Sequence, residues 1–359
     1  RIDVGAHEPK RHMVGGPHLA ALRRALPFEL TDEQEDAVSD ILADMAAPHI
    51  MNRLLLGDVG TGKTAVCAVA LAVVADSGTQ AAVMAPTSVL ARQYADKVGP
   101  LLDRADVSWT LITGSTPAQE RAAASERIAA GKMSVVFGTT AILSEDIAFA
   151  ELSFVVIDEQ HRFGVNQRAS LHQKSLGADL LTMTATPIPR TLALSLYGDV
   201  DVSRIKKRPV PGARVETAVL TPENLDIAYA AIRAAVEQGH QAYVICPTID
   251  PNDDGAALDD VVEGAITQES LHAATITRDD LARYVFPDYT VGLLNGRMPA
   301  AEKDETMFRF HAGEIDVLVS TTVVEVGVDV PNATVMLVYN ADRFGLATLH
   351  QLRGRVGRG

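Results

Sequence analysis

The segment Gly57-Asp58-Val59-Gly60-Thr61-Gly62-Lys63-Thr64 decides the fold of the first half of the chain. It matches the pattern GxxxxGK[ST], follows the apolar run Arg53–Leu56 and opens the helix expected over Lys63–Val74, which is the context this pattern requires. Its glycines let the backbone curl so that N–H groups face a phosphate, and the helix N-terminus favours an anion. A chance glycine-rich turn is the alternative, but both flanking elements argue against it. The segment therefore predicts a phosphate-binding loop.

The residues of this loop have expected parts in binding ATP with Mg²⁺. Lys63 is expected to meet the β- and γ-phosphates, and the Thr64 hydroxyl is expected to bind Mg²⁺. The other residues of the loop are expected to surround the phosphates: Gly57, Asp58, Val59, Gly60, Thr61 and Gly62.

A pair of acids follows the next strongly apolar run, Phe154–Ile157. Asp158 is expected to bind Mg²⁺, and Glu159 to orient or deprotonate the attacking water. By itself, an Asp-Glu pair at a strand end is more often a solvated turn. The metal-binding interpretation is stronger when such a pair follows a phosphate-binding loop, because both segments would lie at the carboxyl edge of one parallel sheet.

A third candidate segment, Phe28-Glu29-Leu30-Thr31-Asp32-Glu33-Gln34, precedes an expected helix. The Gln34 amide carries donors and an acceptor and can read an adenine edge, and Phe28 can pack on the base. The alternative is that Thr31 caps the helix while Phe28 lies in the core.

Apolar runs alternate with helical-period segments along the whole chain. In the first half the expected strands are Arg53–Leu56, Ala81–Ala85, Ser134–Phe137, Phe154–Ile157 and Leu180–Thr184. In the second half they are Val215–Leu220, Ala242–Cys246, Thr290–Leu294, Asp316–Ser320 and Thr334–Tyr339. Continuous apolar strands alternating with helices such as Lys63–Val74 and Thr87–Val98 predict α/β domains whose parallel sheets are buried on both faces.

Two segments interrupt this alternation. Arg204–Gly212 is basic and contains two prolines, which is typical of a linker. Pro251–Asp280 holds eight acidic residues and one basic residue, and we expect it to be a solvated insertion. The expected organisation is an N-terminal linker over residues 1–26, a first domain over 27–203, a linker over 204–212 and a second domain over 213–359. The chain begins with Arg1 and ends at Gly359, and we expect it to be a piece of a longer protein.

Composition limits the classes of function. The 359 residues suggest two domains, and 47% apolar with 22% charged residues is typical of a soluble globular chain. A net charge of −14 argues against a simple basic nucleic-acid coat protein but not against an enzyme with a local basic track. Cys67 and Cys246 lie in apolar runs, as buried thiols in a reducing cytoplasm do. The longest apolar run, Ala65–Ala75, is too short to span a bilayer.

Further motifs occur in a fixed order around the phosphate-binding loop. In the first half they are Ala85–Ala91 (APTSVLA), Leu111–Ser115 (LITGS), Gly138–Ala141 (GTTA), Asp158–Val165 (DEQHRFGV) and Met183–Leu192 (MTATPIPRTL). In the second half they are Asn295–Met298 (NGRM), Thr321–Pro331 (TTVVEVGVDVP) and His350–Gly359 (HQLRGRVGRG). This set resembles the superfamily 2 helicase core, and within it the RecG family, from about Pro27 to the last residue.

The transcription-repair coupling family, Mfd, shares several of these strings and is the nearest rival. Three segments match the RecG pattern and not the Mfd pattern: Gln160, Val326–Pro331 and Gly296-Arg297-Met298. Asn295, where the family usually has His, and the acidic insertion depart from the RecG pattern, although neither touches the expected phosphate chemistry.

The resemblance implies two tandem RecA-like domains with the ATP site in the cleft between them. It implies that the second domain supplies Arg355 and Arg358 to the γ-phosphate, because arginine's rigid fork suits phosphate oxygens. It further implies that Gln351 positions the water or the phosphate and that Asp329 approaches the ribose. For these residues a solvated basic turn is the alternative.

The resemblance also implies residues that contact the DNA backbone and residues that couple the two ligands. The expected DNA contacts are Pro86, Thr87, Gly114, Gly138, Thr139, Thr321 and Thr322. Such contacts position a strand without reading its sequence, and ordinary helix capping by threonine is the alternative for each Thr. His161, Thr184 and Thr186 are expected to relay the state of the nucleotide.

The activity implied is ATP-driven translocation on double-stranded DNA that remodels stalled replication forks and recombination intermediates in DNA repair. The implied partners are branched or duplex DNA, such as forks and Holliday junctions, and single-stranded DNA-binding protein. The implied setting is a monomer in the bacterial cytoplasm, associated with the nucleoid and with no membrane. The alternatives are an Mfd-like translocase that acts on stalled RNA polymerase and a nucleotide-gated DNA-binding fragment without helicase activity. RNA is a weaker alternative, since nothing in the chain reads a 2′-OH.

Overall fold

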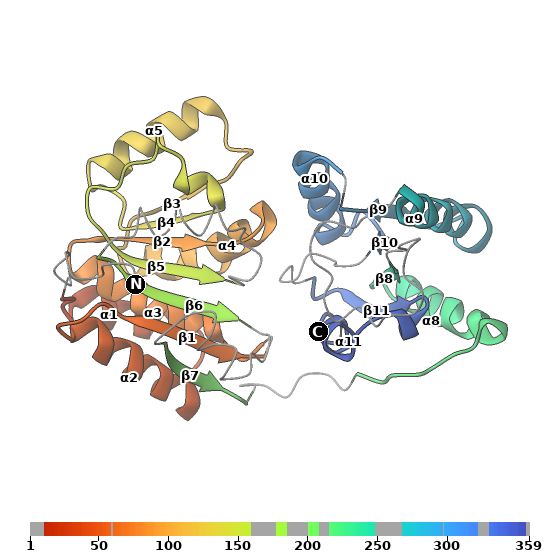
Figure 1. Ribbon diagram of the computed structural model, residues 1–359, viewed down its shortest axis with the longest axis horizontal. Coiled ribbons are helices and arrows are strands. Elements are labelled where there is room, and N and C mark those ends of the chain that lie inside the picture. The colour runs from red at the N-terminus through yellow and green to blue at the C-terminus, as the bar shows by residue number, and fades with distance from the viewer. Residues whose placement is uncertain are drawn as a thin grey trace. The chain divides into compact units, whose positions relative to one another are not determined.

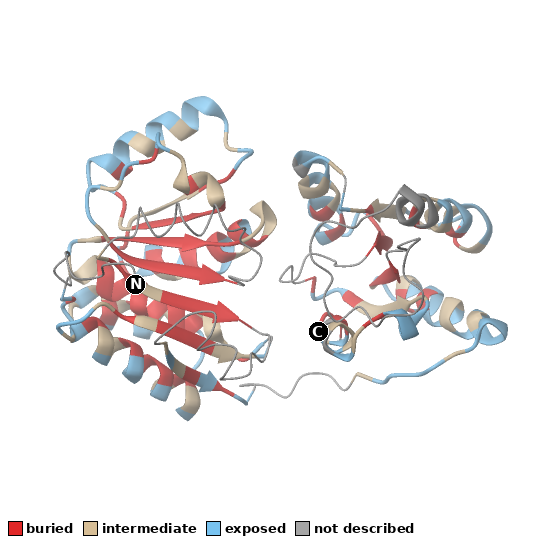
Figure 2. Ribbon diagram, in the orientation of Figure 1, coloured by how far each residue is buried: buried red, intermediate tan, exposed pale blue. Residues whose placement is uncertain are grey.

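The computed structural model describes residues 11–58, 60–158, 177–184, 200–207, 215–247, 268–296, 298–321 and 330–356. The chain divides into two compact units, Arg1–Val210 and Pro211–Gly359, and each unit holds one sheet (Figure 1). We call them domain 1 and domain 2. The buried residues gather on the strands and on the inward faces of the helices, and the outer faces of the helices are exposed (Figure 2).

The sheet of domain 1 has seven parallel strands in the order β3-β4-β2-β5-β6-β1-β7. The strands are β1 (Asn52–Gly57), β2 (Gln80–Met84), β3 (Trp109–Ile112), β4 (Val135–Gly138), β5 (Leu152–Asp158), β6 (Asp179–Thr184) and β7 (Asp201–Ile205). The five strands expected from the sequence are confirmed. The sequence pattern does not predict the two edge strands, β3 and β7. Strand β7 includes Arg204 and Ile205, which belong to the predicted linker, so the linker begins later than predicted.

The helices described in domain 1 are α1 (Pro17–Ala25), α2 (Asp32–Ala46), α3 (Lys63–Asp76), α4 (Ser88–Arg104), α5 (Ala118–Ala129) and the 3₁₀ turn η2 (Thr140–Leu143). Every residue of α3 from Ala65 to Val74 is buried. A helix that is apolar on all sides is a core helix, which explains the long apolar run noted in the sequence. No helix within the described ranges is long and apolar enough to cross a membrane.

The segment expected to be an N-terminal linker contains α1, which packs against α3 and α4. The Asp76 carboxylate, at the end of α3, accepts hydrogen bonds from the backbone N–H groups of His18 (2.8 Å) and Leu19 (2.9 Å). A carboxylate at a helix N-terminus satisfies N–H groups that have no partner within the helix. Residues 17–25 are therefore part of the packed body of domain 1.

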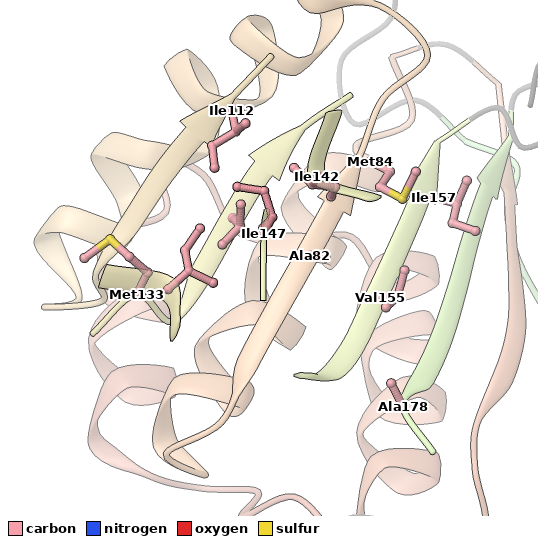
Figure 3. Packing of buried hydrophobic residues seen from close by; sticks show 11 residues of the cluster. Ala82, Met84, Ile112, Met133, Ile142, Ile147, Val155, Ile157 and Ala178 are labelled. Carbon is pink, nitrogen blue, oxygen red and sulfur yellow. The ribbon is translucent and has the colours of Figure 1, made fainter. Parts of the chain in front are cut away.

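A cluster of apolar side chains fills the space between the sheet and the segment around η2 (Figure 3). Its fully buried members include Ile112, Val136, Ile142 and Ile157. Gly138, at the end of β4, approaches this cluster so closely that a Cβ atom there would lie 2.3 Å from the carbonyl oxygen of Ile112. This packing alone requires glycine at that position.

Domain 2 has a four-stranded parallel sheet in the order β11-β8-β10-β9. The strands are β8 (Gln241–Cys246), β9 (Val291–Leu294), β10 (Val317–Thr321) and β11 (Ala333–Val338). The helices are α8 (Leu225–Glu237), α9 (Gln268–Asp280), α10 (Ala300–His311) and α11 (Leu346–Arg353), with the short turns η4 (Pro222–Asn224), η5 (Leu281–Val285) and η6 (Ala341–Arg343).

Two expectations for domain 2 are wrong. Val215–Leu220 is not a strand, because it pairs with no strand of the described sheets, and its Val219 is 97% exposed. The backbone N–H and C=O groups of an unpaired extended segment bond to water instead. Residues 268–280, expected within a solvated insertion, form α9, and its Ala274 is fully buried in the core with Ile232 and Phe286. The remainder of the insertion, residues 251–267, lies outside the described residues.

Candidate nucleotide and DNA site

The loop between β1 and α3 has the curled backbone that phosphate binding requires. Gly60 and Gly62 adopt positive φ angles of 83° and 86°, a region that only glycine enters without strain. Gly62 is the N-cap of α3, and the buried Thr61 donates its hydroxyl hydrogen to the Asp58 carbonyl at 2.8 Å. The loop therefore wraps in front of the N-terminus of α3, while Val59 lies outside the described residues.

The Lys63 ammonium group lies over this loop. Its Nζ donates hydrogen bonds to the carbonyl oxygen of Gly57 and, at 3.2 Å, to that of Asp58. The loop carbonyls thus hold the positive charge in the concavity, where phosphate oxygens can replace them as acceptors. Thr64 follows in the first turn of α3 and is partly exposed.

Asp158 is the last residue of β5 and is buried. One strand, β6, separates β5 from β1, so Asp158 and the phosphate loop share the carboxyl edge of the sheet. The negative charge of this carboxylate also acts on the Cys67 thiol of α3. The pKa of the thiol is raised, first by burial and then by the charge of Asp158. Thr184, at the end of β6, is buried and pairs in register with Leu56 of β1.

These residues fit ATP with Mg²⁺. In the described ranges no group of three or more His, Cys, Asp or Glu side chains could hold a metal ion by itself. Mg²⁺ at phosphate sites is typically bound by one or two carboxylates together with substrate phosphates and waters. The Thr64 hydroxyl and the Asp158 carboxylate at one sheet edge match that donor set.

Gln34 is attached to the phosphate loop. Its side chain is fully buried, its Oε1 accepts from the Thr31 backbone N–H (2.9 Å), and its Nε2 donates to the Thr61 carbonyl (2.7 Å). The Thr31 hydroxyl in turn accepts from the Gln34 N–H, so the two form a capping box at the start of α2. The capping alternative is therefore confirmed for Thr31, and the bond from Gln34 to the loop was not expected.

Phe28 is 48% exposed and is not a core residue, so that alternative is wrong. It lines an open cavity of about 560 Å³, whose other lining residues are Arg23, Leu26, Pro27, Glu29, Leu30 and Glu35. An exposed aromatic ring beside a cavity offers a stacking face for a planar base.

The expected DNA contacts of domain 1 lie at the end of β4 or in the loops that follow β2, β3 and β4, at the same carboxyl edge. The Thr87 hydroxyl accepts from the Leu90 N–H (3.3 Å) and caps α4, and the Thr139 hydroxyl accepts from the Ala141 N–H (3.3 Å) and caps η2. Both threonines therefore act as caps. Gly114 is exposed, with no heavy atom within 4 Å of a Cβ built on it, whereas Gly138 is buried.

Sequence reasoning missed Arg121, which fixes the loop around Thr139. From α5 its guanidinium donates to the Ala141 carbonyl (3.0 Å) and to both carboxylate oxygens of Asp146 (2.6 and 3.1 Å). The hydrogen bond from Arg121, and then one from Ser144, hold the pKa of Asp146 far below its usual range. No sequence pattern marks Arg121 and Asp146 as a pair, because they lie on an ordinary helix surface and in a loop.

In domain 2 the structure describes part of the expected site. Thr321 ends β10, and its buried hydroxyl has no hydrogen-bond partner among the described residues. Arg355 is buried just after α11, and Gln351 belongs to that helix. Besides Val59, six expected site residues of the two domains lie outside the described residues: Glu159, His161, Thr186, Thr322, Asp329 and Arg358.

Comparisons with known proteins place these features in a family. The model of the DEAD/DEAH box helicase family matches residues 31–194, and that of the helicase conserved C-terminal domain matches residues 224–359. The chain is 46% identical to the ATP-dependent DNA helicase RecG of Bacillus subtilis (strain 168), over 97% of this chain and 49% of that protein. It is 45% identical to the RecG of Synechocystis sp., over 93% of this chain and 38% of that protein.

Solved structures agree with this assignment. A structure of RecG bound to a three-way DNA junction matches with a TM-score of 0.79 at 38% identity, over 98% of this chain and 44% of that one. The helicase MrfA bound to DNA matches with a TM-score of 0.66 at 17% identity, which shows the fold alone. The chain spans about half the length of the curated relatives it matches. With a DEAD/DEAH box helicase domain followed by a helicase C-terminal domain, this chain belongs to the RecG-like superfamily 2 helicases.

Proposed function

We propose that this chain is the motor core of an ATP-dependent DNA translocase that remodels branched DNA. The observation that carries the proposal is the Lys63 ammonium held inside a curled phosphate loop, at the same sheet edge as the buried Asp158. The identity to RecG proteins, which are named as ATP-dependent DNA helicases, supports the choice of DNA as the partner.

The protein groups divide the chemistry between them. Lys63 and the loop N–H groups bind the phosphates, Thr64 and Asp158 hold the metal ion, and Glu159 orients and deprotonates the attacking water. ATP with Mg²⁺ supplies the scissile phosphate bond. Arg355, Arg358 and Gln351 stabilise the charge that develops on the phosphate oxygens, and Asp329 contacts the ribose. Hydrolysis changes the protein's affinity for a DNA strand. Only a difference in affinity between the nucleotide states can move the protein one step along the DNA.

The base of the nucleotide stacks on Phe28. Phe28→Ala is expected to raise the KM for ATP up to about tenfold, the equivalent of the roughly 0.5–1.5 kcal/mol of an aromatic contact, and to leave kcat nearly unchanged, because stacking stabilises the ground and transition states alike. Steady-state ATPase assays measure both constants.

Phe308→Ala is the matched control, since Phe308 is also an exposed phenylalanine (61%) but lies on α10 of domain 2. Equal KM values in wild type and Phe28→Ala would show that the base binds elsewhere.

DNA lies along the loops that follow β2, β3 and β4, where it meets Pro86, Thr87, Gly114, Gly138 and Thr139. Thr321 and Thr322 contact it from domain 2, and His161, Thr184 and Thr186 relay the nucleotide state. Branched DNA such as forks and Holliday junctions is the substrate, and single-stranded DNA-binding protein is a partner. The protein works as a monomer in the bacterial cytoplasm, at the nucleoid.

Arg121→Ala is expected to weaken DNA binding, because the Thr139–Ala141 loop loses its attachment to α5. The DNA concentration that gives half-maximal ATPase stimulation should rise about fivefold, the equivalent of one hydrogen bond of about 1 kcal/mol. Titrating duplex DNA into the ATPase assay measures this.

Arg127→Ala removes the same charge from the exposed face of α5 and serves as the control. If both variants shift the DNA titration equally, the effect is one of net charge and not of loop position.

The proposed function is tested by comparing ATP hydrolysis of the full-length protein with branched DNA, with linear duplex and without DNA. Branched DNA should stimulate hydrolysis more than linear duplex does. Equal rates under all three conditions would refute the proposal.

A further inference from the structure

Two neighbouring residues in the first turn of α2 hold two different parts of domain 1. Gln34 donates to the Thr61 carbonyl in the phosphate loop (2.7 Å). Glu33 accepts, with one carboxylate oxygen, the backbone N–H groups of Lys206 (2.6 Å) and Lys207 (2.9 Å). The turn therefore connects the phosphate loop to the residues that follow β7.

Lys206 and Lys207 occupy a particular place in the chain. They follow β7 directly, and the chain passes from there toward the second unit, which begins at Pro211. Backbone bonds fix the end of β7 itself, since Ile205 pairs in register with Gly57 of β1, the first residue of the phosphate-loop motif. Lys206 and Lys207 thus lie one and two residues beyond the last rung of the ladder.

The rest of α2 is tied to β7 as well. The Arg53 guanidinium of β1 donates to the Asp44 carboxylate (2.7 Å) and to the Ser203 hydroxyl (2.8 Å). The Ser203 hydroxyl donates to the Asp40 carboxylate (2.7 Å). Asp40 and Asp44 belong to α2, so these buried and half-buried hydrogen bonds hold α2 against β7.

We propose that Glu33 is a positioning residue that couples the nucleotide state of the phosphate loop to the place where the chain leaves domain 1. When phosphate oxygens take up the Lys63 ammonium, its bonds to the Gly57 and Asp58 carbonyls are given up. The loop then changes shape at Thr61, Gln34 transmits the change to the first turn of α2, and Glu33 carries it to Lys206 and Lys207. This inference rests on the proposed function, because it needs ATP in the loop.

The charge on Glu33 suits this task. Hydrogen bonds from the Lys207 and then the Lys206 N–H lower the pKa of its carboxyl group, so it stays ionised throughout the neutral range. Charge-assisted hydrogen bonds are shorter and stronger than neutral ones. A neutral amide at position 33 would still accept both N–H groups, whereas a methyl group would accept neither.

Amide hydrogen exchange of Lys206 and Lys207 gives a direct test. In the wild-type protein, adding AMP-PNP with Mg²⁺ should change the exchange rate of these two amides. In Glu33→Ala the amides should exchange faster without nucleotide and should not respond to it, while Glu33→Gln should keep most of the response. Asp32→Ala is the matched control, since it also removes an acid from the first turn of α2 but from an exposed side chain.

ATPase assays supply the second readout. Glu33→Ala should lower kcat in the presence of duplex DNA about fivefold or more, as expected for an allosteric coupling, with the KM for ATP unchanged. Glu33→Gln should restore most of this rate, and Asp32→Ala should match wild type. A general loss of structure would instead lower the melting temperature and raise the KM.

The outcomes separate the two proposals. If AMP-PNP leaves the phosphate-loop amides of the wild-type protein unchanged, the proposed function fails and the coupling fails with it. If AMP-PNP protects that loop but leaves Lys206 and Lys207 unchanged, the coupling alone is wrong. It is also wrong if Glu33→Ala and Asp32→Ala give the same exchange and the same kcat.

Discussion

Lys63→Ala is expected to reduce ATP hydrolysis by about 10²–10³-fold, the usual cost of removing one donor that stabilises transition-state charge. The position of the Lys63 ammonium explains the size of this loss. The Lys63 ammonium is held by the carbonyls of Gly57 and Asp58 inside the curl of the loop, ahead of the N-terminus of α3. Its loss leaves those carbonyls facing the phosphates, and their partial negative charge repels a phosphate oxygen. A phosphate-release assay under saturating ATP measures the effect.

Lys132→Ala is the appropriate control. Lys132 is an exposed lysine of the same domain, in the turn before β4 and so at the amino edge of the sheet. The Lys132→Ala variant should hydrolyse ATP at the wild-type rate. If Lys63→Ala kept more than half of the wild-type rate, the phosphate loop would not be the catalytic site.

Gly62→Ala is expected to lower ATP hydrolysis about 10²-fold, the loss that a displacement of about 1 Å at a reacting group can cause. Gly62 has φ +86°, and a Cβ atom there would lie 2.2 Å from Nε2 of Gln34. The Gln34 side chain cannot simply rotate away, because it is fully buried and both the Oε1 and the Nε2 atom of its amide are hydrogen-bonded. The substitution therefore has to displace either the phosphate loop or the first turn of α2.

Gly78→Ala separates this collision from backbone strain. Gly78 also has a positive φ (+69°), but no heavy atom lies within 4 Å of its Cβ position. Alanine there should cost about 1–2 kcal/mol of unfolding free energy and leave ATP hydrolysis intact. Urea unfolding and ATPase assays on both variants distinguish the two effects. An equal loss of activity in both would contradict the role assigned to the contact between Gly62 and Gln34.

The central strands and the phosphate loop of domain 1 were predictable because their sequence signals are local. β1, β2, β5 and β6 are short apolar runs bounded by Gly, Pro or Asp, and both of their faces are covered, so periodicity was not needed to recognise them. The loop was recognisable because its conformation needs glycine at Gly60 and Gly62. Residues whose type is dictated by their own backbone leave a mark in the sequence.

Other elements depend on partners that are distant in the sequence. β7 is polar and partly exposed, and it is a strand because it pairs with β1, about 150 residues earlier in the chain. The converse holds for Val215–Leu220, which contains three β-branched residues, as strands often do, but lacks a described partner. The acidic residues near α9 suggested a solvated segment, although Ala274 faces the core. The attachments made by Arg121 and Glu33 likewise involve common residue types, and only the fold brings their partners near.

The two buried cysteines give the protein one natural thiol in each domain. Cys67 lies in the middle of α3 and is fully buried, and Cys246 ends β8 with 4% of its surface exposed. Burial raises the pKa of the Cys246 thiol to about 11, and it raises that of Cys67 as well. Both thiols are therefore protonated and shielded in the native state, and a thiol reagent can react with each only after its own domain opens. The rates of modification at the two positions would report separately how often each half of the motor unfolds, without any engineered label.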